Sequence, residues 1–130
     1  ENGLIHFLAA LDENKTGFLH MSIGEIFLKL DEREKAANHF ESAVFHARSQ
    51  ELEIRARYML GEILLNGGNL VAAGEQFKQI IAKVPESADA HLFLGDVYLE
   101  MGNSVQAQTQ WQRARGIDDR HHGANLRLSS

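Results

Sequence analysis

The sequence is poor in the residues that cross-link or sharply bend a chain, with no cysteine and a single proline among 130 residues. The absence of cysteine excludes disulfides, thiolate metal ligands and a cysteine nucleophile. No uninterrupted apolar run approaches the ~20 residues that span a bilayer, which argues against membrane insertion. The net charge of −5 argues against a general attraction to nucleic-acid phosphates.

The apolar residues of the sequence recur with the spacing of amphipathic helices. Apolar residues make up 44% of the chain, enough for one ordinary domain, and no strand-like alternation competes. We expect helices at residues 2–13, 17–30, 54–66, 70–83, 88–101 and 104–116, with one more beginning after Asp31. Short loops between them favour antiparallel neighbours.

Two helix starts are expected from capping residues. Asp31, with Glu34 three residues later, has the pattern of a capping box. The polar residues from Asn14 to Gly17 predict a break, with Thr16 as the N-cap of the following helix.

Two segments leave alternatives open. Residues 49–53 contain three extra residues that form either a longer helix end or a loop. The tail contains Leu126 and Leu128 and is either a capping or truncated helix or a frayed terminus.

One pattern recurs along the chain. A helix with an internal glycine is followed by a turn and then by a helix with a small residue and an aromatic residue. Gly61 and Gly95, the glycines of two units, are 34 residues apart. Self-similarity at this period indicates an array of helical repeats.

Glycine destabilises a helix interior by about 1 kcal/mol relative to alanine. Three glycines at matching positions therefore predict places where two helices pack too closely for a side chain. We expect small residues opposite the glycines and aromatic residues between successive hairpins. The glycines are Gly24, Gly61 and Gly95, the small residues are Ala36, Ala73 and Ala107, and the aromatics are Phe40, Phe77 and Trp111.

Taken together, these positions resemble the tetratricopeptide repeat family over residues 17–119. The matching residues are Ile23, Gly24, Phe27, Glu34, Lys35, Ala36, Phe40 and Ala43 in the first unit, Leu60, Gly61, Gly68, Ala73, Phe77 and Pro85 in the second, and Leu94, Gly95, Tyr98, Gly102, Ala107, Trp111 and Ala114 in the third. Departures from the family pattern include Asp31 in place of the turn glycine.

The resemblance implies an all-α fold, a right-handed α-solenoid of antiparallel helix hairpins with about three repeats and flanking helices. We expect one domain over residues 1–130. Its parts are a helix from a preceding partial repeat (1–16), three repeats (17–53, 54–87 and 88–119) and a capping or truncated helix (120–130).

The resemblance also implies that the first helix of each repeat lines a concave groove that binds peptides or proteins. Each of these helices carries an apolar–acid–apolar triplet on one face. The triplets are Met21, Glu25 and Leu28; Tyr58, Glu62 and Leu65; and Leu92, Asp96 and Leu99. Phe18, Arg55, Asn66 and Glu100 are expected at the margins.

Such a groove suits an apolar segment that carries lysine or arginine, and its acids argue against a clamp for acidic carboxyl-terminal tails. Tyr58 is the expected anchor. The alternative is a self-associating structural segment of a larger scaffold, its groove filled by its own end or a second copy.

Other functions have weaker support. The seven histidines do not have zinc-ligand spacing, and we expect no metal or other cofactor. The basic carboxyl end, with Arg113, Arg115, Arg120 and Arg127, has no interleaved aromatic set for stacking bases. No nucleophile motif or isolated acid pair indicates an enzyme.

Overall fold

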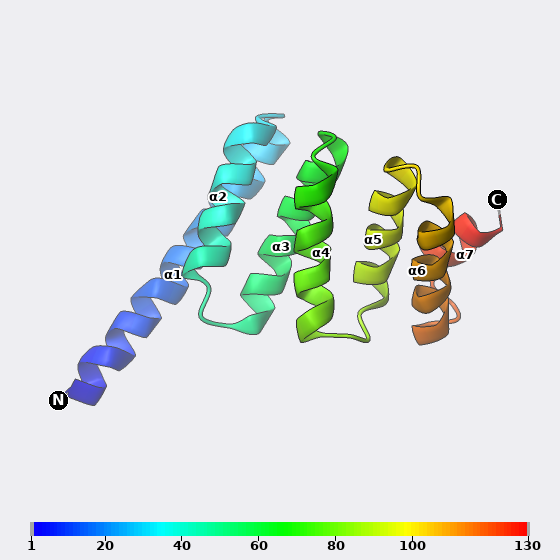
Figure 1. Ribbon diagram of the computed structural model, residues 1–130. Helices are drawn as coiled ribbons and strands as arrows, with labels where there is room; N and C mark the ends of the chain where they lie inside the picture. The colour runs from blue at the N-terminus through cyan, green and yellow to red at the C-terminus, as the bar shows by residue number, and fades with distance from the viewer. Residues whose placement is uncertain (1, 130) are drawn as a thin grey trace. The chain divides into compact units, whose positions relative to one another are not determined.

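The computed structural model describes residues 2–129, with side chains from residue 15 onward, and these residues form seven helices and no strands (Figure 1). The helices are α1 (Asn2–Lys29), α2 (Arg33–His46), α3 (Gln50–Asn66), α4 (Leu70–Lys83), α5 (Ala88–Glu100), α6 (Ser104–Ile117) and α7 (His122–Leu128). They divide into two compact units, residues 1–63 and 64–130. None of the described helices is both long and apolar enough to cross a membrane.

In the first unit, α1 is a single helix through the segment where the sequence predicted a break. The prediction of a break at residues 14–17, with Thr16 as an N-cap, is wrong. Gly17 is buried, and a methyl group on it would lie 2.8 Å from Leu52 Cδ2. The glycine is therefore a site of close packing, which offsets its cost within a helix.

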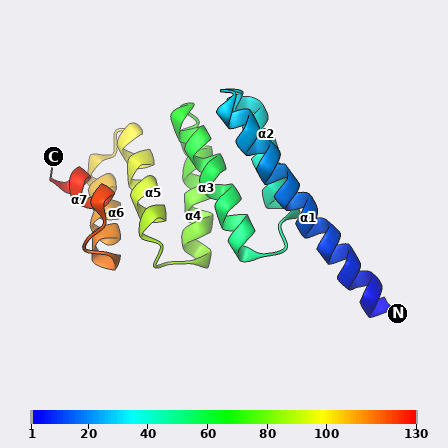
Figure 2. The same cartoon turned by 180° about the vertical axis from the view of Figure 1, so that it is seen from behind.

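The amino-terminal part of α1 extends beyond α2, as both views show (Figures 1 and 2). The helix spacing of Leu4, Ile5, Leu8 and Leu11 predicts an apolar stripe in this part of α1, where side chains lie outside the described residues.

Asp31 ends α1 instead of capping α2, so the predicted capping box is also wrong. The N-cap of α2 is Glu32, which makes no side-chain capping hydrogen bond. Asp31 has φ 61°, and Gly68 and Gly102 have φ 83° and 88° in the later turns. The amide of Glu32 donates to the carbonyl of Phe27 at 2.8 Å, as in a Schellman motif. Asp31 thus takes the left-handed position that glycine occupies in the other repeats.

The extra residues near 49–53 lengthen α3, which begins at Gln50. Its start is fixed by Ser49, whose hydroxyl accepts a hydrogen bond from the amide of Leu52 at 3.2 Å. The extra residues therefore form a longer helix end and not a loop.

The second unit contains the end of α3 and helices α4 to α7. Helix α5 packs against α4 and α6, and α7 packs against α6. A buried cluster joins the last three helices. Its members are Leu92, Ala107, Trp111, Ala114 and Ala124, with Ala88, Tyr98 and Leu128 partly buried against them. The tail after residue 118 therefore supplies a packed helix.

Two of the internal glycines, Gly24 and Gly95, lie under the aromatic residues of their own hairpins. A methyl group on Gly95 would lie 2.5 Å from Trp111 Nε1 and 3.0 Å from the carbonyl oxygen of Ala107. A methyl group on Gly24 would lie 2.8 Å from Phe40 Cε1. The predicted close packing is confirmed at these two glycines. Phe40 and Trp111 also pack inside their own hairpins, a contact that the sequence did not predict, and Trp111 packs against Ala124 of α7 as well.

Phe77 does act between hairpins. Its ring on α4 stacks on Phe93 of α5, with centroids 5.4 Å apart.

Candidate functional site

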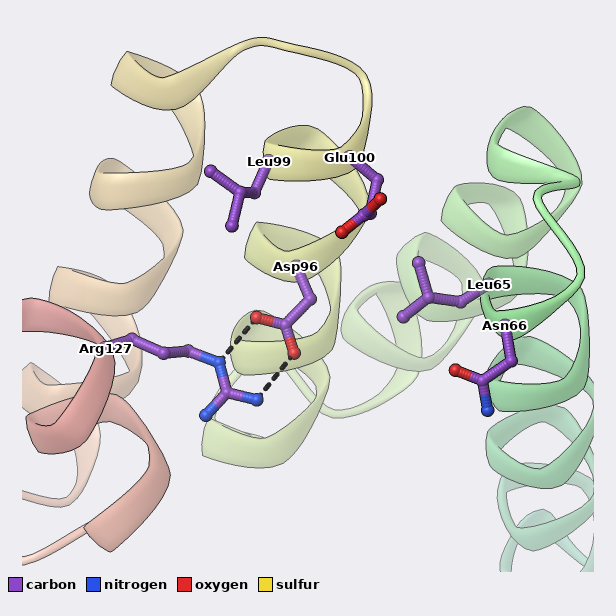
Figure 3. Close-up of a pocket in the computed structure, with 6 residues that line it drawn as sticks. All are labelled: Leu65, Asn66, Asp96, Leu99, Glu100 and Arg127. Atoms are coloured by element: carbon purple, nitrogen blue, oxygen red, sulfur yellow. Dashed lines mark hydrogen bonds and ion pairs between the residues drawn. The ribbon is translucent and has the colours of Figure 1, made fainter. Parts of the chain in front are cut away.

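The second unit contains a hollow of about 490 Å³ where the end of α3, the last turns of α5 and α7 meet (Figure 3). Six residues line it: Leu65, Asn66, Asp96, Leu99, Glu100 and Arg127. The first five were predicted from the sequence as groove residues. Helix geometry brings them together because α5 presents Asp96, Leu99 and Glu100 at spacings of three and four residues.

Asp96 is held by the chain itself. Its two carboxylate oxygens accept hydrogen bonds from Nε of Arg127 at 2.5 Å and from Nη2 at 2.8 Å. Trp111 Nε1 also donates to Oδ1 of Asp96 at 3.2 Å. The Asp96 side chain is only 18% exposed. In this arrangement Asp96 is an internal partner for a cation and not an open acid.

The other residues that line the hollow are at least partly open to solvent. The Leu99 side chain is partly open to solvent, with 47% of the residue exposed, and Leu65 is half-buried. Glu100 and Asn66 are exposed. Within the part of the chain that the structure describes, neither side chain has an ion pair or hydrogen bond. The hollow therefore combines apolar walls, one unpaired carboxylate and one unpaired amide.

In the first unit the predicted residues divide between packing and a smaller site. Met21 is 3% exposed and belongs to the core. Glu25 pairs with Arg55, Oε1 to Nη2 at 3.4 Å, on the surface. Phe18 and Arg55 line a small cavity of about 70 Å³ with Ser49, Glu51 and Leu52.

The remaining predicted residues lie outside both cavities. Leu28 and Tyr58 are half-buried, and Leu92 is 5% exposed within the cluster beneath α7. Partial desolvation raises the pKa of the Glu62 carboxyl. One continuous groove through all thirteen residues stays a prediction.

Three histidines gather in the first unit. The Nδ1 atoms of His20 and His39 are 3.0 Å apart, and the His20 ring stacks on His46 with centroids 5.7 Å apart. Burial lowers the pKa of His20, and the neighbouring His39 and His46 lower it further. Among the described residues, no group of three or more histidine, cysteine, aspartate or glutamate side chains is arranged to hold a metal ion.

His91 occupies a packing position. It is 6% exposed, with Nδ1 2.8 Å from Gln110 Oε1 and Nε2 2.9 Å from the carbonyl oxygen of Pro85.

Arg127 is the lining residue that sequence reasoning missed. The sequence placed it in a basic carboxyl end, and Leu126 and Leu128 beside it suggested a helix. Its pairing with Asp96 has no local signal, because the two residues lie 31 positions apart and belong to different helices.

This arrangement of hairpins agrees with comparisons to known families. Residues 21–83 and residues 68–127 each match a family model described as a tetratricopeptide repeat. The chain is a tetratricopeptide repeat protein. It therefore belongs to a class of protein–protein interaction scaffolds that are generally not enzymes. No curated protein matches the sequence.

Solved tetratricopeptide repeat structures have the same fold. The crystal structure of YrrB, described as a TPR protein with an unusual peptide-binding site, is 27% identical, with a TM-score of 0.80 over 88% of this chain. This chain spans 58% of the YrrB chain. The expected fold class, an α-solenoid of helix hairpins, is confirmed.

Two less similar structures share the fold. The first TPR of Spaghetti, bound to the HSP90 peptide SRMEEVD, is 10% identical, with a TM-score of 0.78 over 89% of this chain and 90% of its own. MamA is 20% identical, with a TM-score of 0.74 over 95% of this chain and 72% of its own.

Proposed function

We propose that this chain is a protein-interaction module whose second unit binds an apolar segment bearing lysine or arginine. The observation that carries the proposal is the hollow between the ends of α3 and α5, with Leu65 and Leu99 as apolar walls and Glu100 as an unpaired acid. The description of YrrB as having a peptide-binding site supports a peptide as the form of the partner.

The chemistry of the hollow supports a division of roles. Leu65 and Leu99 offer apolar contact, which supplies most of the affinity in such grooves. The exposed amide of Asn66 can donate and accept hydrogen bonds with a peptide backbone. Glu100 attracts a cation and orients the segment, since exposed charges affect encounter and specificity more than affinity.

Acidic partners fit this surface less well. Asp96 and Glu100 both lie at the hollow, and the one arginine that lines it is already paired with Asp96. Spaghetti is shown with the acid-containing peptide SRMEEVD, but at 10% identity it shares only the fold with this chain. With Asp96 and Arg127 paired to each other, the remaining charge at the hollow is that of Glu100, which favours a basic partner.

The proposal is tested by selecting peptides from a random phage-displayed library on the intact chain. We expect enriched sequences to combine apolar residues with lysine or arginine. A synthetic peptide of the selected sequence is then titrated by calorimetry against wild type, Glu100→Lys and Glu86→Lys. Glu86 is an exposed acid before the opposite end of α5 and provides a control with the same charge change.

Glu100→Lys should weaken binding roughly three- to tenfold, because an exposed attraction of up to about 1 kcal/mol is replaced by repulsion. Glu86→Lys should have little effect. Enrichment of acidic peptides, or equal losses in the two variants, would contradict the proposal.

A further inference from the structure

Helix α7 covers part of the surface that the apolar–acid–apolar pattern assigns to a partner. Of the triplet on α5, Leu92 is 5% exposed beneath α7 and Asp96 is bound by Arg127. Only Leu99 remains open, at 47% exposure. The chain's own last helix therefore occupies two of the three positions.

The contacts of α7 define what this surface accepts. A methyl group on Gly123 would lie 2.9 Å from Leu92 Cδ2, so a larger residue would require the Leu92 side chain to shift. Ala124 is fully buried, and Arg127 reaches Asp96. These three residues share one helix face, since residues three and four apart are neighbours on a helix surface. The surface fits a helix with two adjacent small residues followed by arginine.

Helix α7 is also short, and its polar ties to α5 are Arg127 on Asp96 and His121 Nε2, which lies 2.5 Å from Asp89 Oδ1. It has seven residues, well below the ~12–15 at which isolated helices become marginally stable. Its first turn is held by His121, whose Nδ1 accepts from the amide of Ala124 at 3.2 Å. Leu126 on its outer face is 57% exposed. An element of this kind belongs to the part of a fold that opens most easily.

We propose that α7 is a resident ligand of this surface, and that a basic helical segment with the same arrangement of small residues and arginine replaces it. The proposal rests on the proposed function, because α7 has the chemistry assigned there to the partner. Release of α7 frees Asp96 and Leu92, and the surface then extends from the hollow along α5. Binding of the external segment is weakened by the fraction of molecules in which α7 is docked.

The test uses the selected basic peptide, without tryptophan, and the full chain. In the wild type, hydrogen exchange of the amides in α7 is measured with and without saturating peptide. The fluorescence of Trp111, the only tryptophan in the chain, reports the loss of its contact with α7. Peptide affinity is then compared for wild type, Arg127→Gln and Arg115→Gln, an exposed arginine on α6 that controls for lost positive charge.

We expect peptide to speed exchange in α7 and to shift Trp111 emission to the red. Arg127→Gln should tighten peptide binding about three- to tenfold more than Arg115→Gln does. Unchanged or slower exchange in α7 would overturn the proposal, even if Arg127→Gln proved unstable. Equal affinities for the two variants would also overturn it. In either case, binding that still depends on Glu100 would leave the proposed function intact, whereas loss of that dependence would contradict the proposed function itself.

Discussion

Arg127 on α7 binds Asp96 on α5 through two parallel hydrogen bonds, Nε to Oδ1 and Nη2 to Oδ2. The pair is partly buried, with the Arg127 side chain 31% exposed and Asp96 18% exposed. Paired hydrogen bonds of this kind fix orientation as well as adding energy. This contact attaches the last helix of the chain to the repeat before it.

The first prediction concerns the stability that this pair contributes. Asp96→Asn should lower the free energy of unfolding of the second unit by about 1–2 kcal/mol, because Arg127 and Trp111 lose a charged acceptor. Arg127→Gln should cost a similar amount, because it leaves the less exposed Asp96 carboxylate without its cation. The measurement is urea unfolding followed by Trp111 fluorescence. Additive effects in the double variant would show that the two residues do not interact.

A second prediction concerns close packing at Gly95. Gly95→Ala should destabilise the second unit, although alanine is the better helix former, because its methyl group would lie 2.5 Å from Trp111 Nε1. Gly95→Leu should cost about 1–3 kcal/mol through overpacking. Gly116→Ala is the control, since a methyl group there meets no atom within 4 Å. An increase in stability at both positions would contradict close packing at Gly95.

A third prediction concerns the turn between α1 and α2. Asp31→Gly should stabilise the chain by about 0.5–1 kcal/mol, because glycine adopts positive φ without the steric cost that aspartate has. The lost contact is an exposed pair with Arg33 at 3.3 Å, which contributes little. Gly68→Ala, at φ 83°, should destabilise by a similar amount. Thermal unfolding followed by circular dichroism measures both, and a less stable Asp31→Gly chain would refute the proposed role of Asp31.

The histidine cluster predicts sensitivity to acid. The folded-state pKa of His20 lies below its ordinary value of 6.5, so the unfolded chain binds that proton more tightly. The resulting stability is fully present above pH 6.5 and is lost as pH falls through the lowered pKa. The melting temperature should therefore fall between pH 7.5 and pH 5. His20→Gln should reduce this dependence, whereas the exposed His122→Gln should not. The same slope in both variants would contradict this assignment.

The sequence predicted features governed by local periodicity. The expected helix at 70–83 has the bounds of α4. Close packing at Gly95 was predicted because a glycine is unfavourable inside a helix unless it has a packing role. Five of the six residues around the hollow were predicted, because the family resemblance implied that the first helices of the repeats line a groove.

Where one residue type serves two purposes, the sequence was misleading. Gly17 suggested a break, but it packs under Leu52 within a continuous helix. Asp31 suggested an N-cap. However, a residue with a short polar side chain also tolerates positive φ, and Asp31 has that conformation in the turn between α1 and α2. Arg127 was missed as a lining residue because its partner is set by tertiary packing.

The most direct test of the central claim is a charge exchange between Glu100 and the bound peptide. The selected basic peptide and a version with its critical lysine or arginine changed to glutamate are each titrated against wild type and Glu100→Lys. If Glu100 faces that cation, the wild type should prefer the basic peptide, and Glu100→Lys should recover affinity for the glutamate peptide. An unchanged order of affinities in Glu100→Lys would contradict the assignment of this hollow as the binding site for a basic partner.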